Sequence, residues 1–187
     1  MPAVSNASPL IYLAKLHKLE LLKFLYGRII IPKAVFEEII LKGKAFEASE
    51  TYAIESAIGK WIHVQELPQE LIGKYQFLDK HPRLHRGEIE ALKLAKESGA
   101  MVFITDDLDA RYAAKILGLR LRGTLGVLAE AHKKGFLALP ILKKSIDALI
   151  DLGFRVDIAV YKEILHRAEE FEGFRKRIQG KVGKIQG

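Results

Sequence analysis

Five short apolar runs, separated by stretches with helical periodicity, constrain the fold of this chain more than any other feature of its sequence. The runs predict strands at residues 2–5, 28–31, 61–64, 101–105 and 119–122. Helices are predicted in between, at residues 9–16, 18–25, 32–41, 45–59, 87–98, 107–117 and 124–134. Because strands that alternate with helices form βαβ units, we expect an α/β domain whose central parallel sheet is covered on both faces.

Prolines and glycines support the predicted helix boundaries. Pro9 and Pro32 are expected at the first position of their helices, where the missing N–H group leaves no hydrogen bond unmade. Gly99, Gly118 and Gly135 are expected to end helices in the left-handed conformation.

The last third of the chain has a purely helical pattern, with helices predicted at 140–152 and 157–172. The predicted domains are an α/β domain at 1–136, a helical extension packed on the same core at 137–172, and a basic, flexible tail at 173–187. The tail has five cations and no acid: Arg175, Lys176, Arg177, Lys181 and Lys184. Ile146, Leu149 and Ile150 are expected to be exposed on the helical extension, which predicts a homodimer or a higher oligomer.

The composition narrows the class of protein and its partners. A formal net charge of +7 favours a polyanionic partner, nucleic acid before membrane. Cysteine is absent, which excludes disulfides, thiolate metal sites and a cysteine nucleophile. We find no signal-peptide pattern and no apolar run of the roughly 18 residues that span a bilayer. These features predict a soluble, cytoplasmic protein without a membrane partner.

Acidic and amide side chains follow two of the predicted strands. Asn6 comes directly after the first strand, and Asp106 and Asp107 come directly after the fourth. In a parallel sheet that winds outward in both directions from its first strand, these two ends lie side by side at the edge where ligands bind. We therefore expect one shared site, although Asp106 is also expected to cap the helix that follows it.

Two helices are expected to add carboxylates to that site. Glu38 lies three residues after Val35 on an inward-facing stripe, and Glu88 shares a helix face with Leu92. Glu90 is the competing candidate for the role of Glu88. Carboxylates drawn inward on separate elements are costly to bury unless a positive charge joins them. The expected ligand is a hard divalent cation held by oxygens, Mg²⁺ or Mn²⁺.

Five segments, in a fixed order along the chain, carry a family resemblance. They are VSNASPLI at 4–11, IPKAVFEE at 31–38, LHRGE at 84–88, ITDDLDAR at 104–111 and GTLGVL at 123–128. Together they resemble the PIN-domain (PilT N-terminus-like) family, in a predicted nucleic-acid-binding branch related to toxin ribonucleases. The resemblance implies a Rossmann-like three-layer α/β/α sandwich. It also implies a metal-dependent site that hydrolyses single-stranded RNA, in which acidic residues hold one or two metal ions that activate water.

The resemblance assigns roles to the acidic residues. Glu38, Glu88 and Asp107 are the expected catalytic residues and metal ligands, and Asp106 is expected to support Asp107 or to replace it. Asn6 stands where the family most often has aspartate. Its amide oxygen is expected to ligate the metal, but it brings no charge and cannot accept a proton. We therefore expect weakened metal affinity and reduced activity.

Two hydroxyl side chains and two arginines are expected beside these acids. Ser8 and Thr105 match the small hydroxyl positions that line the site. Arg86 ends a basic loop at 80–86 and is a candidate contact for nucleic acid. Arg111, on the helix after the fourth strand, is a second candidate, with an ion pair inside its own helix as the alternative.

Three functions fit these patterns. The first is a PIN-type endoribonuclease, and the second is a catalytically inactive nucleic-acid-binding module in which Asn6 marks a lost active site. The third is a partner-binding protein whose groove takes an antitoxin-like protein or a second copy of the chain. A receiver-like phosphoacceptor domain is excluded because its adjacent aspartates follow the first strand. A nucleotide-binding Rossmann enzyme is excluded because no glycine-rich loop follows the first strand.

Overall fold

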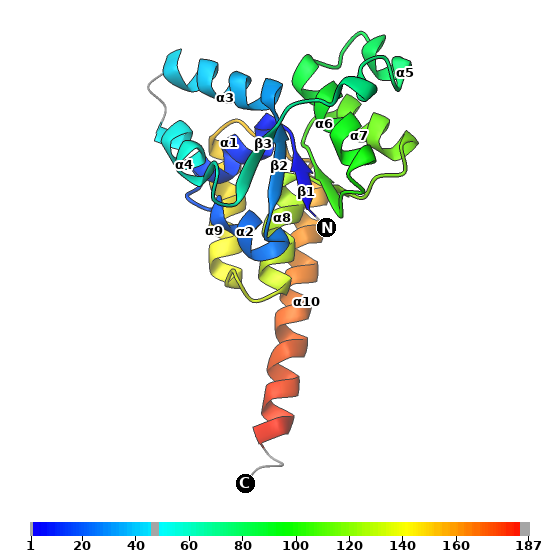
Figure 1. Ribbon diagram of the computed structural model, residues 1–187. Coiled ribbons are helices and arrows are strands. Elements are labelled where there is room, and N and C mark those ends of the chain that lie inside the picture. The colour runs from blue at the N-terminus through cyan, green and yellow to red at the C-terminus, as the bar shows by residue number, and fades with distance from the viewer. Residues whose placement is uncertain (1, 46–48, 184–187) are drawn as a thin grey trace. The chain divides into compact units, whose positions relative to one another are not determined.

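The structure, a computed structural model, describes residues 2–45 and 49–183. It consists of two compact units, Met1–Val127 and Leu128–Gly187, and each is described here by itself. The first unit contains a five-stranded parallel sheet, of which β1, β2 and β3 are labelled in Figure 1, and its strand order is β3-β2-β1-β4-β5. The strands are β1 (Ala3–Ser5), β2 (Ile29–Pro32), β3 (Ile62–Gln65), β4 (Val102–Ile104) and β5 (Leu121–Arg122). All five coincide with the predicted apolar runs, so the predicted sheet is confirmed.

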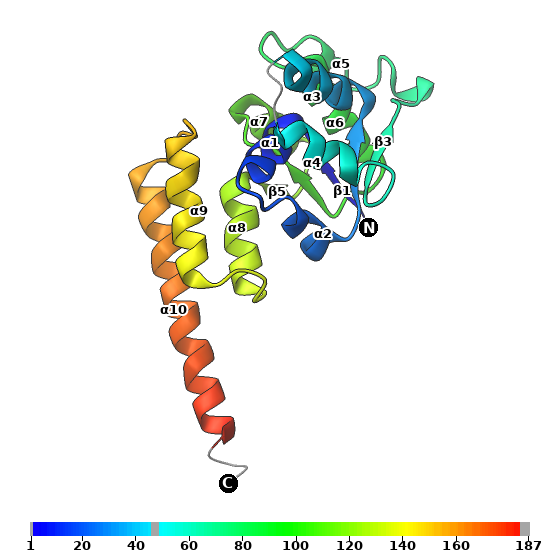
Figure 2. The same ribbon diagram turned by 90° about the vertical axis from the view of Figure 1, so that its left-hand side faces the viewer.

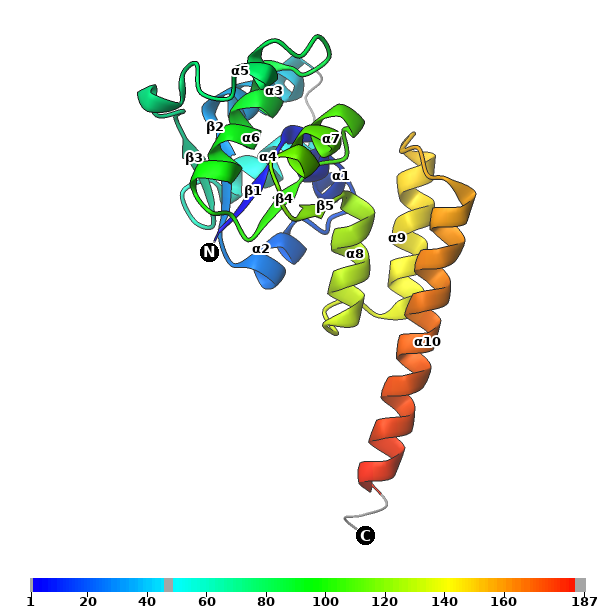
Figure 3. The same cartoon turned by 90° about the vertical axis from the view of Figure 1, so that its right-hand side faces the viewer.

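The central strands β1, β2 and β4 are buried along their whole length because helices cover both faces of the sheet. Val4 of β1 lies opposite Ile30 of β2 and Phe103 of β4, and all three are buried. They share a core cluster with α6 (Arg86–Glu97) and α7 (Leu108–Ile116), which lie on one face (Figure 3). On the other face lie α1 (Ala7–Lys15) and α4 (Ser49–Ala57) (Figure 2). The predicted three-layer α/β/α sandwich is therefore confirmed.

Three further helices belong wholly or partly to this unit. They are α2 (Glu20–Tyr26), α3 (Lys33–Ala45) and the start of α8 (Thr124–Lys133). The expected positions of both prolines are wrong, since Pro9 is the third residue of α1 and Pro32 ends β2. Pro9 is tolerated there because the first four N–H groups of a helix have no partner within it. Gly99 and Gly118 have φ angles of 58° and 71°, as expected for residues that end helices.

Between β3 and α6 the chain forms two short helices that the sequence pattern did not predict, η1 (Gln69–Leu71) and α5 (Gln76–Asp79). A buried lysine holds them. Lys93 of α6 is 2% exposed, and its Nζ donates to both carboxylate oxygens of Asp79, at 2.8 and 2.9 Å, and to the Leu71 carbonyl at 3.3 Å. This segment is therefore fixed by polar contacts with a residue distant in the sequence. Such contacts produce no local periodicity from which the two helices could be predicted.

The second unit contains the end of α8, α9 (Leu139–Asp151) and α10 (Ile158–Gly183). The buried ring of His132 in α8 faces two backbone carbonyls, that of Leu137 at 2.9 Å and that of Ala168 in α10 at 3.3 Å. Its edge meets the ring of Phe171. These contacts pack α10 against α8.

Two predictions about this unit are wrong. The last helix does not end at residue 172 but continues to Gly183, because Gly173 keeps a negative φ and Glu172 pairs with Lys176 one turn on. Ile146 and Leu149 are fully buried, so of the three residues expected on the surface only Ile150, 45% exposed, lies there. The domain boundary after residue 136 stays a prediction. Within the described residues, no helix is long and apolar enough to cross a membrane.

Candidate active site

The polar groups after β1 and β4 lie side by side, as the strand order requires. The Asn6 N–H donates to the carbonyl of Ile104 at 3.1 Å, which continues the pairing of the two strands. The Asn6 side chain is 3% exposed, and its Nδ2 donates to Oγ1 of Thr105 at 2.8 Å. Thr105 Oγ1 also accepts the N–H of Asp107 at 3.2 Å. The Thr105 hydroxyl thus joins Asn6 and Asp107 across the two strand ends.

Asp107 is the N-cap of α7. Its backbone is extended, with φ −68° and ψ 133°, and its Oδ1 accepts the N–H of Ala110 at 2.7 Å. The expectation that Asp106 caps this helix is therefore wrong by one residue. One carboxylate oxygen of Asp107 holds the helix, and the other accepts no hydrogen bond from the described residues.

Asp106 turns away from α7 and binds the start of α8. Its two carboxylate oxygens accept the N–H and the hydroxyl of Thr124, at 2.7 and 2.5 Å. A Cβ atom on Gly123 would lie 2.8 Å from Asp106 Oδ1, so only glycine allows this approach. Burial raises the pKa of the Asp106 carboxyl, and the hydrogen bonds from Thr124 and the charge of Arg111 oppose that rise. Both oxygens of Asp106 are thus occupied within the protein.

The remaining two acids lie on α3 and on the first turn of α6. Glu88 Oε2 accepts the N–H of His85 at 2.9 Å, so this carboxylate holds the start of its own helix. A Cβ atom on Gly87 would lie 3.1 Å from Cγ2 of Val35 and 3.4 Å from Oε2 of Glu38. Gly87 therefore brings the Glu38 carboxylate against the beginning of α6.

The electrostatics of Glu88 connect the three carboxylates expected to be catalytic. Burial raises the pKa of the Glu88 carboxyl above its usual value, and the negative charges of Asp107 and Glu38 raise it further. The backbone N–H and the side chain of His85 act in the opposite direction. Glu88 therefore lies within electrostatic reach of both other acids, although the three belong to different elements.

Two features of this region bear on whether it could hold a cation. Asn6 Oδ1 is buried and accepts no hydrogen bond from the described residues. The charged form of Glu88 is disfavoured first by burial and then by the negative charges of Asp107 and Glu38, which raise the pKa of its carboxyl. Both features fit a hard divalent cation held by oxygens. Among the described residues, however, no group of three or more His, Cys, Asp or Glu side chains is arranged to hold a metal ion.

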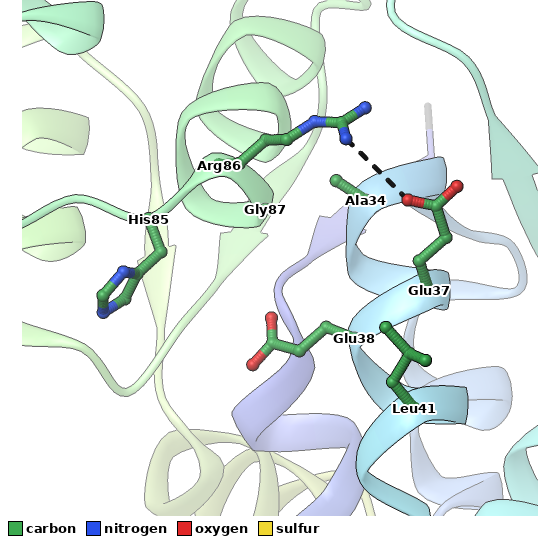
Figure 4. A pocket seen from close by; sticks show the side chains of 7 residues that line it. All are labelled: Ala34, Glu37, Glu38, Leu41, His85, Arg86 and Gly87. Carbon is green, nitrogen blue, oxygen red and sulfur yellow. Dashed lines mark ion pairs between the residues drawn. The ribbon is translucent and has the colours of Figure 1, made fainter.

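A pocket of about 340 Å³ lies between α3 and the start of α6 (Figure 4). It is lined by Ala34, Glu37, Glu38, Leu41, His85, Arg86 and Gly87. Glu37 and Glu38 point to different sides of α3: Glu37 lies near Arg86, whereas the Glu38 carboxylate extends on the side of His85 (Figure 4). The pocket and the acidic residues therefore adjoin each other through Glu38.

The other predicted site residues lie around these groups. Arg86 Nε donates to a carboxylate oxygen of Glu90 at 2.7 Å. Glu90, the competing candidate for the role of Glu88, is therefore held in an ion pair. Arg111 donates to the carbonyl of Thr105 at 3.2 Å, and within the described residues it forms no ion pair with an acid of its own helix. Ser8 is half-buried in the first turn of α1.

Sequence reasoning missed three residues that shape this region: Gly87, Gly123 and Thr124. Each lies in a segment that carried the family resemblance, but their roles are contacts with distant chain segments. Glu37 was also overlooked. The sequence pattern places the next residue, Glu38, on the inward-facing stripe of the helix. Glu37 lines the pocket only because α6 lies close to α3.

A comparison with protein-family models matches residues 2–170 of the chain to the family DUF3368, described as a PIN domain. None of the curated proteins matches the chain.

Proposed function

The chain belongs to the PIN-domain family, and from that premise we propose that it is a metal-dependent endoribonuclease that hydrolyses phosphodiester bonds of single-stranded RNA. A PIN domain indicates a nuclease-type function, nucleic-acid binding and the use of a divalent metal in general terms. The net charge of +7 supports a polyanionic substrate. The observation that carries the proposal is the joining of the two strand ends by the Thr105 hydroxyl, which contacts both Asn6 and Asp107 and leaves the buried Asn6 Oδ1 without a donor among the described residues.

The proposed ligands of Mg²⁺ or Mn²⁺ are Glu38, Glu88, Asp107 and the amide oxygen of Asn6. When bound, such a cation activates a water molecule and stabilises the charge that develops on the phosphate. The protein's own contribution is positioning. The N–H groups of His85 and Ala110 each hold one carboxylate oxygen of Glu88 and Asp107, which leaves the second oxygen of each available.

We assign structural roles, rather than metal binding, to the remaining residues. Thr105 orients the Asn6 amide, and Asp106 fixes the start of α8 because both of its oxygens bind Thr124. Because Thr124 occupies both of its oxygens, Asp106 is not proposed as a metal ligand. Ser8, two residues after Asn6, is proposed to line the site.

A catalytically inactive nucleic-acid-binding or partner-binding module is the second candidate function. The presence of Asn6 in place of an acid favours it, because the site has one negative charge fewer with which to hold a cation. An antitoxin-like partner, a homodimer and a cytoplasmic location remain predictions from the sequence.

Cleavage of single-stranded RNA with Mn²⁺ or Mg²⁺ tests the proposal. We expect the native chain to cleave, Asp107→Asn to lose activity, and Asp151→Asn, the same charge change at an exposed position of α9, to keep it. If only Asn6→Asp cleaves, the second function is correct. Equal cleavage by the native chain and Asp107→Asn would contradict the nuclease proposal.

A further inference from the structure

We propose that the pocket between α3 and α6 binds one nucleobase of the RNA strand, and that Glu37 selects guanine. This inference rests on the proposed function, since the adjoining acidic residues are then the place where the backbone of the same strand is cut. The proposal adds a base-binding subsite and a residue that determines base specificity, both distinct from the proposed catalytic acids.

The volume and the apolar part of the lining of the pocket suit a base. Its volume of about 340 Å³ is at the small end of ligand pockets, which run from roughly 300 to 1,000 Å³. Ala34, Leu41 and Gly87 provide lining surface without charge. Leu41 is 72% exposed, although a large apolar side chain is usually covered, so it is available to pack against the flat face of a base.

Glu37 and Arg86, two of the four polar side chains that line the pocket, place an acceptor beside a donor. Arg86 is held by its short contact with Glu90, at 2.7 Å, and lies 3.9 Å from Glu37 Oε2, which is long for an ion pair. The contact between Arg86 and Glu37 is therefore weak and largely solvated. A base can replace it without leaving either charge buried alone.

Guanine matches this pair better than the other three bases. Its Watson–Crick edge places two donors, N1–H and N2–H, next to one acceptor, O6. The two donors fit the two oxygens of the Glu37 carboxylate, and O6 fits a free N–H of the Arg86 guanidinium. Adenine, cytosine and uracil do not present two adjacent donors on this edge.

The connection to the acidic residues is made by Glu38. It lines the pocket, and its charge also raises the pKa of Glu88. Glu37 and Glu38 both line the pocket from adjacent positions on α3, and their carboxylates extend to different sides of that helix (Figure 4). A base bound at Glu37 would therefore hold its own phosphates near the acidic residues.

Binding without cleavage tests this subsite. Fluorescence anisotropy would measure the affinity of the full chain, in EDTA, for seven-nucleotide oligouridylates that carry guanine, adenine, cytosine or uracil at the centre. We expect the guanine oligonucleotide to bind roughly 10-fold more tightly than the adenine one, within the range that one bidentate base contact supplies. Glu37→Gln should reduce this ratio to about one.

Glu20→Gln is the matched control, because it removes the same charge from an exposed position of α2. It should keep the guanine preference. Equal affinity of the native chain for all four oligonucleotides, or a guanine preference that survives in Glu37→Gln, would overturn the proposal. Guanine preference in a chain that never cleaves RNA would refute the nuclease function alone, whereas cleavage without base preference would refute the pocket alone.

Discussion

Replacing Asn6 by aspartate tests the metal proposal through stability, independently of any enzymatic activity. The Asn6 side chain is 3% exposed and its only hydrogen bond among the described residues runs from Nδ2 to Thr105 Oγ1. Asn6→Asp removes this donor and adds a negative charge to a region where Glu88 already responds to the charges of Asp107 and Glu38. In the absence of metal, the variant should be less stable than the native chain.

The size of the loss follows from two opposing effects. Burying a carboxylate costs several kcal/mol in a protein interior. The Thr105 hydroxyl can turn to donate to it, and a hydrogen bond to a charged group contributes about 1.5–3 kcal/mol. We therefore expect a decrease of about 2–4 kcal/mol in the free energy of unfolding in EDTA. Mn²⁺ at about 100 times its dissociation constant should return about 2.7 kcal/mol.

Urea unfolding, with and without Mn²⁺, measures both effects. Asn6→Ala serves as the control, because it removes the amide without adding charge, and Mn²⁺ should stabilise it less than it stabilises Asn6→Asp. If Asn6→Asp is as stable as the native chain in EDTA and gains nothing from Mn²⁺, the buried oxygen at this position does not face a cation site. The ligand set proposed above would then be wrong.

Three further predictions concern the surroundings of the site. Gly87→Ala should lower the free energy of unfolding by about 1 kcal/mol, because the added Cβ would lie 3.1 Å from the buried Val35. This loss should exceed the gain from the better helix propensity of alanine. A urea titration measures the difference, and a variant more stable than the native chain would contradict this prediction. Asp106→Ala should lose about 2–4 kcal/mol by leaving Thr124 without its acceptor, whereas Asp106→Asn should melt within a few degrees of the native chain because it keeps acceptor and size without the buried charge. The raised pKa of Glu88 means that its contribution to stability is complete below the ordinary glutamate pKa and is lost as the pH rises through the raised value. Glu88→Gln should therefore gain stability relative to the native chain as the pH rises through that window in EDTA, and parallel pH profiles of urea unfolding would refute it.

The adjacent pair Asp106 and Asp107 shows where sequence reasoning stops. Both are carboxylates after the same strand, and the sequence favoured Asp106 as the helix cap. In the structure Asp107 caps α7, because the chain reaches the extended backbone conformation of an N-cap one residue later. Asp106 is then free to face Gly123 and Thr124, which follow β5. The contact between Asp106 and the segment after β5 depends on the tertiary structure, and no local sequence pattern predicts it.

The sequence by itself determined the five strands and their parallel arrangement, since apolar runs and helical periodicity are local properties that burial on two faces imposes. It also determined that an amide stands at position 6, where an acid was expected. Only the tertiary structure decided that the oxygen of this amide is buried without a partner, that Lys93 fixes the segment before α6, and that α3 and α6 enclose a pocket beside Glu38. These features depend on how closely distant segments of the chain approach one another. A glycine such as Gly87 permits a close approach, but the sequence does not show which segment will contact it.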